Sequence, residues 1–177
     1  MLALISAITA SFGSIFFLGR IAYNLHDVKK SRSLSELAVL ESKTLRKFRQ
    51  VLLMCGTLFA ISIYLFIAPM LHNRLIAAAW SIEYIGVIFV AMIPALGKTF
   101  KLHVTFAQVM GAGMLALTYV FYLSLPRFWN VIELIIGVFM TLFAIATYLD
   151  RRHYIQHELA FIFLSHFTIV LAALSLL

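Results

Sequence analysis

The chain has 177 residues, of which 63% are hydrophobic and only 12% are charged. Soluble domains carry about 25% charged residues, so water is not the main solvent of this chain. Its net charge of +7 at pH 7 comes from basic residues that lie between apolar stretches, and this distribution argues against a nucleic-acid partner. The single cysteine, Cys55, excludes an intramolecular disulfide and a cysteine metal motif.

Six uninterrupted apolar stretches are each long enough to cross a bilayer core of about 30 Å. They predict transmembrane helices at residues 1–25, 50–71, 75–97, 102–124, 129–149 and 158–177. Helix is the only workable state, because lipid offers an exposed backbone no hydrogen-bond partner and the alternation of barrel strands is missing. The sequence therefore predicts an all-α integral membrane bundle, with residues 1–177 as one six-helix domain.

The basic residues of the connectors predict the orientation of this bundle. Connectors one, three and five hold eleven Lys and Arg residues, whereas connectors two and four hold only Arg74 and Arg127. Positively charged connectors stay on the cytoplasmic side. We therefore expect both termini outside and the odd connectors in the cytoplasm, in the cell inner or plasma membrane.

The first connector, residues 26–49, is the only sizeable segment between the predicted spans. Ser33 and Glu36 have the S-x-x-E spacing of a helix capping box. Leucines then recur at roughly helical spacing, with Lys43, Arg46 and Lys47 between them. We expect a basic amphipathic helix that runs into the second span and either lies on the anionic inner leaflet or docks a cytoplasmic partner.

Ionisable side chains inside the spans are functional candidates, because each is costly in hydrocarbon unless it is paired or faces water. Glu83 lies about two turns inside the third predicted helix. His166 lies well inside the sixth, where we expect it to hydrogen-bond a neighbouring helix, with Glu83 as one candidate partner. Glu133 is nearer the outer interface, and His103 opens the fourth helix. We interpret Glu83, His103 and His166 as candidates for ligand binding or proton coupling.

A second polar set gathers at the cytoplasmic end. His153 and His157 are four residues apart, which places two imidazoles on one helical face within reach of one metal ion. His26, Asp27 and Asp150 would add ligands, for example for zinc, and leave a position for the water of metal-assisted hydrolysis. The alternative interpretation is a group of solvated residues at the membrane edge.

Two further patterns concern helix packing and an internal similarity of the sequence. The fourth predicted helix contains Ala107-x-x-x-Gly111 and Ala112-x-x-x-Ala116, and small residues at this spacing let helices approach closely. The segments IEYIGVIFVAM (82–92) and IELIIGVFMTLFA (132–144) are similar, as are HVTFA (103–107) and HELAF (157–161). Either a helical hairpin is duplicated, or apolar segments match by chance.

The stretch GVIFVAMIPALGKTFKLHVTFA (86–107), with HELAFIFLSHF (157–167), resembles a superfamily of six-helix membrane proteins that includes the damage-regulated autophagy modulator family and small prokaryotic relatives. The likeness rests on Pro94, His103 and Ala107 and covers about a fifth of the chain. It implies a six-helix bundle and brings no catalytic residues. RRHYIQHELAF (151–161) resembles, more faintly, membrane hydrolases of the ceramidase and progestin-and-adipoQ-receptor group, which implies a His and Asp metal site.

The sequence has no phosphate-binding glycine loop, serine nucleophile motif or nucleotide fingerprint. Our leading hypothesis is therefore a polytopic membrane protein without a catalytic motif and without a cofactor. It would bind membrane lipids or a small apolar ligand, or partner another membrane protein or a second copy of itself. The alternatives are a metal-dependent lipid hydrolase with a cytoplasm-facing His and Asp site, and a proton-coupled transporter that uses Glu83 and His166.

Overall fold

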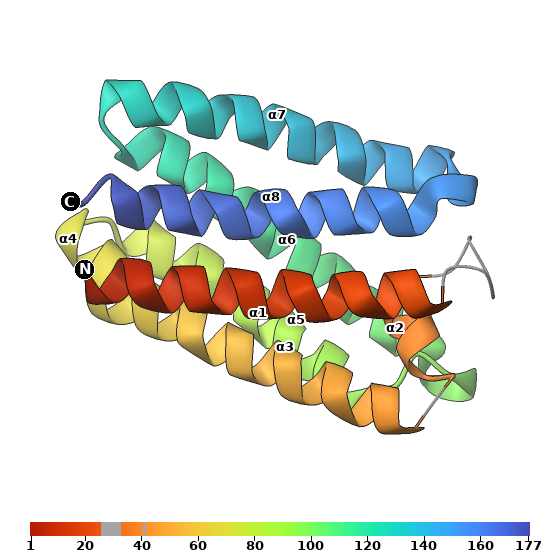
Figure 1. The fold of residues 1–177 in the computed structure, drawn as a ribbon. Helices are drawn as coiled ribbons and strands as arrows, with labels where there is room; N and C mark the ends of the chain where they lie inside the picture. Colours follow the sequence, from red (N-terminus) through yellow and green to blue (C-terminus); the bar gives the residue numbers. More distant parts are fainter. Residues whose placement is uncertain (26–32, 41) are drawn as a thin grey trace.

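The computed structural model describes residues 1–25, 33–40 and 42–177, and this part of the chain folds into helices and contains no strand (Figure 1). The α-helices are α1 (Leu2–Leu25), α2 (Leu34–Ala38), α3 (Ser42–Ser62), α4 (Ala68–Met70), α5 (Arg74–Met92), α6 (Phe100–Ser124), α7 (Arg127–Leu149) and α8 (Tyr154–Leu174). A π-helical turn, Ile63–Ile67, joins α3 to α4, and 3-10 turns at Gly97–Thr99 and Arg151–His153 precede α6 and α8.

Within the described residues, six helical segments are long and apolar enough to cross a membrane. They are Leu2–Tyr23, Ser42–Met70, Arg74–Met92, Gly97–Ser124, Arg127–Leu149 and Tyr154–Leu174. The predicted all-α bundle with six membrane-length helices is therefore confirmed, and the fold is compatible with a multi-pass membrane protein.

The long helices run side by side along one axis, with the N- and C-termini at the same end (Figure 1). Helix α2 and the links from α5 to α6 and from α7 to α8 lie at the opposite end, which we call the connector end. Helix α8 packs against α1, α6 and α7, while α5 packs against α3 and α6. The first and last helices are thus neighbours, although they are farthest apart in the sequence.

Two helix boundaries differ from the predicted spans. Helix α3 begins at Ser42 and not at residue 50, so Lys43, Arg46 and Lys47 form its first turns, and the expected basic helix does run into the second span. Helix α5 ends at Met92 and not at residue 97, because Pro94 has no backbone N–H and disfavours a helical conformation in the residue before it.

The expectation that the first connector lies on the membrane surface or docks a partner is wrong for residues 34–38. The capping box is confirmed: the backbone N–H of Ser33 donates to Glu36 Oε2 at 2.9 Å, and the N–H of Glu36 donates to Ser33 Oγ at 3.3 Å. The short helix that follows does not present its leucines to a membrane surface, because Leu34 and Leu37 are buried with Leu18 of α1. A helix this short is unstable alone, and burying both leucines against the bundle stabilises it.

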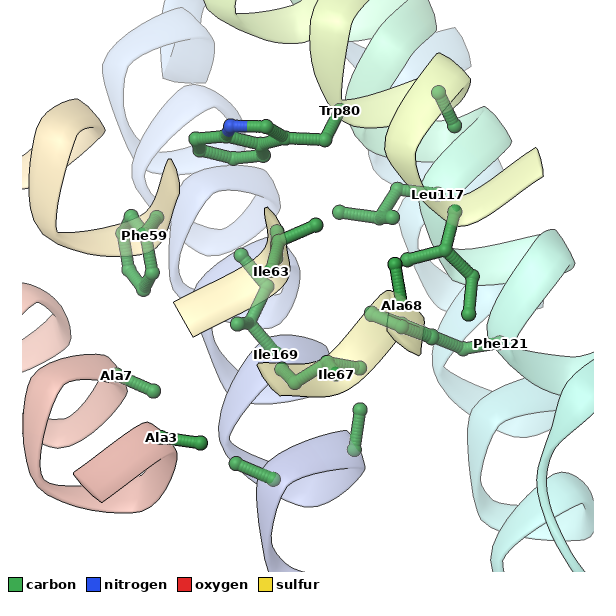
Figure 2. Close-up of a cluster of buried hydrophobic side chains, with 14 of the residues drawn as sticks. Ala3, Ala7, Phe59, Ile63, Ile67, Ala68, Trp80, Leu117, Phe121 and Ile169 are labelled. Carbon is green, nitrogen blue, oxygen red and sulfur yellow. The ribbon is translucent and has the colours of Figure 1, made fainter. Parts of the chain in front are cut away.

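Three apolar clusters fill the bundle, and the smallest, with Met114, Ile136, Met140 and Leu171, lies between α6, α7 and α8. The two larger clusters lie at opposite ends of the bundle. One lies toward the termini and is built on Ile67, Trp80, Phe121 and Ile169 from four different helical segments (Figure 2). The other lies at the connector end and is built on residues such as Leu18, Leu37, Phe48, Val90 and Ile155. The inner face of the bundle is therefore apolar at both ends, and the buried polar residues between these clusters require a separate explanation.

Helices α5 and α6 approach each other closely at two glycines. A Cβ atom on Gly113 would lie 2.6 Å from the Cα of Glu83, and one on Gly86 would lie 2.6 Å from the backbone nitrogen of Met110. A Cβ on Gly111 would have no heavy atom of a neighbouring helix nearer than 4.0 Å. The small residues of this helix do serve packing, but Gly113 and not Gly111 makes the close contact with α5.

Candidate functional site

Buried polar side chains lie between the two larger apolar clusters. On α1, Ser14 lies between Ala10 of one cluster and Leu18 of the other. On α5, Glu83 lies between the Trp80 and Val90 levels, and on α8, His166 lies between the Ile155 and Ile169 levels. Because these residues belong to helices that the sequence separates widely, the fold alone brings them to one depth of the bundle.

Glu83 is only 2% exposed, and its backbone is covered by Gly113 of α6. Its Oε2 atom has no hydrogen-bond partner among the described residues, and the same holds for the indole Nε1 of Trp80, three positions earlier on α5. The Trp80 nitrogen points away from the Ile67 and Ile169 end of the cluster (Figure 2). The inner face of α5 thus carries a buried donor and a buried acceptor that no protein group satisfies in the described part of the chain.

His166 has its partner on another helix. Its Nδ1 atom lies 3.4 Å from Ser14 Oγ of α1, and its ring lies 4.8 Å from the ring of Phe59 on α3, measured between centroids. The prediction that His166 bonds a neighbouring helix is confirmed, but its hydrogen bond is to Ser14 and not to Glu83. The reason is topological, because α8 packs against α1 and not closely against α5.

Glu133 is the most enclosed carboxyl group that the structure describes, with 0% of its surface exposed. Neither Oε1 nor Oε2 has a hydrogen-bond partner within the described ranges. It lies on the inner face of α7 with Ile136, Gly137 and Met140, and this face packs against α6 and α8. The sequence placed Glu133 near the outer interface, but burial by two neighbouring helices removes it from water.

His103 closes the end of α5. Its Nδ1 lies 2.6 Å from the carbonyl oxygen of Ile93, so Nδ1 carries the proton and donates to it. Pro94 follows Ile93 and interrupts the helix, and the imidazole satisfies a carbonyl that the interruption leaves free. This contact gives His103 a structural role at the helix interruption that Pro94 causes.

Three of the predicted metal ligands, Asp150, His153 and His157, lie close together where α7 ends and α8 begins. Asp150 Oδ2 lies 2.8 Å from His153 Nδ1 and 3.7 Å from His157 Nε2. The hydrogen bond from His153 holds the pKa of Asp150 below its ordinary value. His26 and Asp27 lie outside the described residues. Within residues 1–25, 33–40 and 42–177, no three His, Cys, Asp or Glu side chains are arranged to hold a metal ion.

Glu158, in the next turn of α8, joins the first connector to this end of the bundle. Its Oε2 accepts a hydrogen bond of 2.8 Å from the backbone N–H of Leu34, at the first residue of α2. Helix α2 therefore has two carboxyl groups at its N-terminus, Glu36 from its own capping box and Glu158 from α8. Carboxylates at this position are favoured by the helix dipole.

An apolar groove of about 560 Å³ lies between α1, α7 and α8. Its walls are formed by Ile15, Leu18, Gly19, Phe139, Phe143, Leu159, Ala160, Ile162, Phe163 and Leu164. A Cβ atom added to Gly19 would meet nothing within 4 Å, so this glycine opens space in the wall. At its connector side, the ring of Phe143 lies 6.0 Å from the ring of His157.

Sequence reasoning missed the groove, Ser14 and Trp80. The groove could not be found, because its wall combines residues from three helices with no shared motif. Trp80 had a usable signal, since it is three residues from Glu83 and shares its helical face. Ser14 had none, because serine in an apolar helix is common when its hydroxyl bonds the preceding turn.

No family model matches the chain, and no curated protein or solved structure matches it either. The class is therefore defined by the fold itself, an α-helical bundle with six membrane-length helices in its described residues.

Proposed function

We propose that this chain is an integral membrane protein that binds one anionic membrane lipid, with an acyl chain in the groove between α1, α7 and α8. The groove is the observation that carries the proposal. Its volume of about 560 Å³ falls in the range of about 300–1,000 Å³ that is usual for ligand pockets. All ten residues of its wall are apolar or glycine.

An acyl chain suits this wall better than a polar solute does. The wall offers no charged side chain and no amide or hydroxyl side chain to orient a polar ligand. Because the groove lies between spans that face hydrocarbon, a lipid chain can enter it sideways without crossing a polar barrier. The aromatic rings of Phe139, Phe143 and Phe163 supply large apolar surfaces for such a chain.

The charge at the connector end favours an anionic headgroup. Arg20 is exposed and is the residue after Gly19 of the groove wall. The ring of His157 lies beside the ring of Phe143. The acidic groups near His157 have other partners, because Asp150 is hydrogen-bonded to His153 and Glu158 accepts from the Leu34 N–H. These contacts reduce their repulsion of an anion. A headgroup phosphate would therefore meet positive charge where the acyl chain leaves the groove.

The same end carries most of the basic residues outside the core, including Lys98, Lys101 and Arg152, whereas Arg74 and Arg127 begin helices at the end of the termini. The positive-inside rule then supports a cytoplasmic connector end and external termini. The cytoplasmic leaflet of an inner or plasma membrane is the one rich in anionic lipids. Orientation and headgroup preference are consistent with each other.

Two glycines of α1 allow a matched test. Gly19→Leu would fill the groove, whereas Gly13→Leu adds the same side chain at an exposed position of the same helix, where a Cβ atom meets only the Cys55 sulfur at 3.9 Å. Lipid retained per protein would be counted by native mass spectrometry after purification in mild detergent. We expect Gly19→Leu to lose the bound lipid and Gly13→Leu to keep it. Equal lipid retention by both variants would contradict the proposal.

The metal-dependent hydrolase is a weaker proposal. Asp150 lies close to both His153 and His157, but within the described ranges these three side chains are not arranged to hold a metal ion. The other candidate ligands, His26 and Asp27, belong to residues that the structure does not describe. A protein partner or a second copy is also weaker. The exposed residues of α7, such as Leu134, Val138 and Leu142, are apolar, and bulk lipid covers such a surface equally well.

A further inference from the structure

We propose that Glu83 and Glu133 are two proton-binding sites in the interior of the bundle, on the two helices that flank α6. This proposal is independent of the lipid groove, whose wall contains neither residue. It rests on burial, on missing hydrogen-bond partners and on the similar surroundings of the two carboxyl groups.

The two glutamates have equivalent places in the fold. Glu83 precedes Gly86 on α5, and a Cβ on Gly86 would meet Met110 of α6 at 2.6 Å. Glu133 precedes Gly137 on α7, and a Cβ on Gly137 would meet Tyr119 of α6 at 3.2 Å. In both cases the carboxyl group lies about one turn before a glycine that packs on the same central helix. The two glutamates belong to the similar segments 82–92 and 132–144, and the spacing from Glu to Gly is three residues in the first and four in the second.

No cation on the packed helices neutralises either carboxyl group. Titratable and charged groups on the helices that pack against α5 and α7 have other partners or positions. Those with a partner elsewhere are Arg49 at the Met92 carbonyl, Tyr64 at Ser81, His103 at the Ile93 carbonyl, Tyr119 at Thr141, His153 and His157 at Asp150, Glu158 at the Leu34 N–H and His166 at Ser14. Cys55 is a buried thiol, Tyr122 and Tyr154 are half-buried, and Lys43, Arg46, Lys47, Lys98, Lys101 and Arg152 are exposed.

An ionised carboxylate in this position would be an uncompensated charge in a low-dielectric interior, which is strongly unfavourable. A bound proton removes the charge and converts the carboxylate into a hydrogen-bond donor. Glu83 Oε2 and both oxygens of Glu133 have no hydrogen-bond partner in the described part of the chain, so no protein contact competes with that proton. The ligand of each site is therefore a proton, and the sites exchange it with water when the helices separate transiently.

Infrared spectroscopy of the purified protein tests this directly, because a protonated carboxylic acid has a C=O band distinct from that of a carboxylate. Spectra would be recorded at neutral pH in H₂O and D₂O for the parent, Glu83→Gln, Glu133→Gln and the control Glu36→Gln. Glu36 is only half-buried in the capping box, so its replacement should remove no acid band. We expect each interior substitution to remove one acid band and both bands to shift in D₂O.

Three results would overturn the proposal. Acid bands that neither interior substitution removes would show that the two groups are ionised. Bands that never shift in D₂O would show fixed neutral groups that do not exchange protons. Bands that disappear when sodium chloride is added at constant pH would indicate a metal-cation site. If a Gln variant does not purify as a monodisperse protein, the corresponding Glu→Asp variant serves, because it moves the acid band instead of removing it.

Discussion

Gly113 offers a sharp test of the α5–α6 contact. In Gly113→Ala, the new methyl group would lie 2.6 Å from the Cα and 2.7 Å from the Cβ of Glu83. These are backbone and near-backbone atoms, so no flexible side chain can move aside and the helices must separate. Gly111→Ala is the matched control on the same helix, since its methyl group would meet only the Phe161 ring at 4.0 Å.

The magnitude follows from two opposing effects. Overpacking a close contact lowers the free energy of unfolding by about 1–3 kcal/mol. Replacing glycine by alanine inside a helix raises it by up to about 1 kcal/mol. We therefore expect Gly113→Ala to lower the free energy of unfolding by about 1–2 kcal/mol. Gly111→Ala has only the favourable effect and should be neutral or up to about 1 kcal/mol more stable.

The protein contains its own reporter for this measurement. Cys55 is the single cysteine and is buried on α3. A maleimide dye that fluoresces on reaction with a thiol will therefore report unfolding in detergent as temperature rises. We expect a lower midpoint for Gly113→Ala than for the parent and no decrease for Gly111→Ala. Equal midpoints for the two variants would refute the close packing of α5 on α6.

Two further predictions concern the connector end. Glu158→Ala removes the acceptor of the Leu34 N–H. Since an intramolecular hydrogen bond contributes about 0.5–1.5 kcal/mol, amide exchange across 34–38 should become several-fold faster than in Gln156→Ala. Unchanged exchange would show that Glu158 does not stabilise α2. In a Cys55→Ser background, a membrane-impermeant maleimide should label Arg127→Cys but not Lys98→Cys in right-side-out vesicles, and the opposite pattern would reverse the orientation.

The sequence predicted the helical segments because hydrocarbon leaves the backbone no alternative to internal hydrogen bonds. It also predicted the Ser33–Glu36 capping box, because that motif depends on residues three positions apart. Local rules were weaker at the segment ends. The start of α3 at Ser42 depends on the burial of Phe48 against the connector-end cluster, which is a contact between distant parts of the chain.

The candidate site was predictable only residue by residue. Glu83, Glu133 and His166 were identified because each interrupts an apolar segment. Their partners were not, because Ser14 and His166 are 152 positions apart and meet only when α8 packs on α1. The groove is a packing defect between three helices, and Gly19 in its wall has no sequence signal apart from its small size.

The most direct test of lipid binding is site-specific photocross-linking in native membranes. A benzophenone side chain would replace Phe143 in the groove wall or Phe12, which is 73% exposed on α1 and outside the groove. Mass spectrometry of the adducts would identify the lipids. We predict that position 143 captures one anionic lipid class well above its membrane abundance, whereas position 12 captures lipids in proportion to the membrane. The same lipid distribution at both positions would contradict a specific lipid site in the groove.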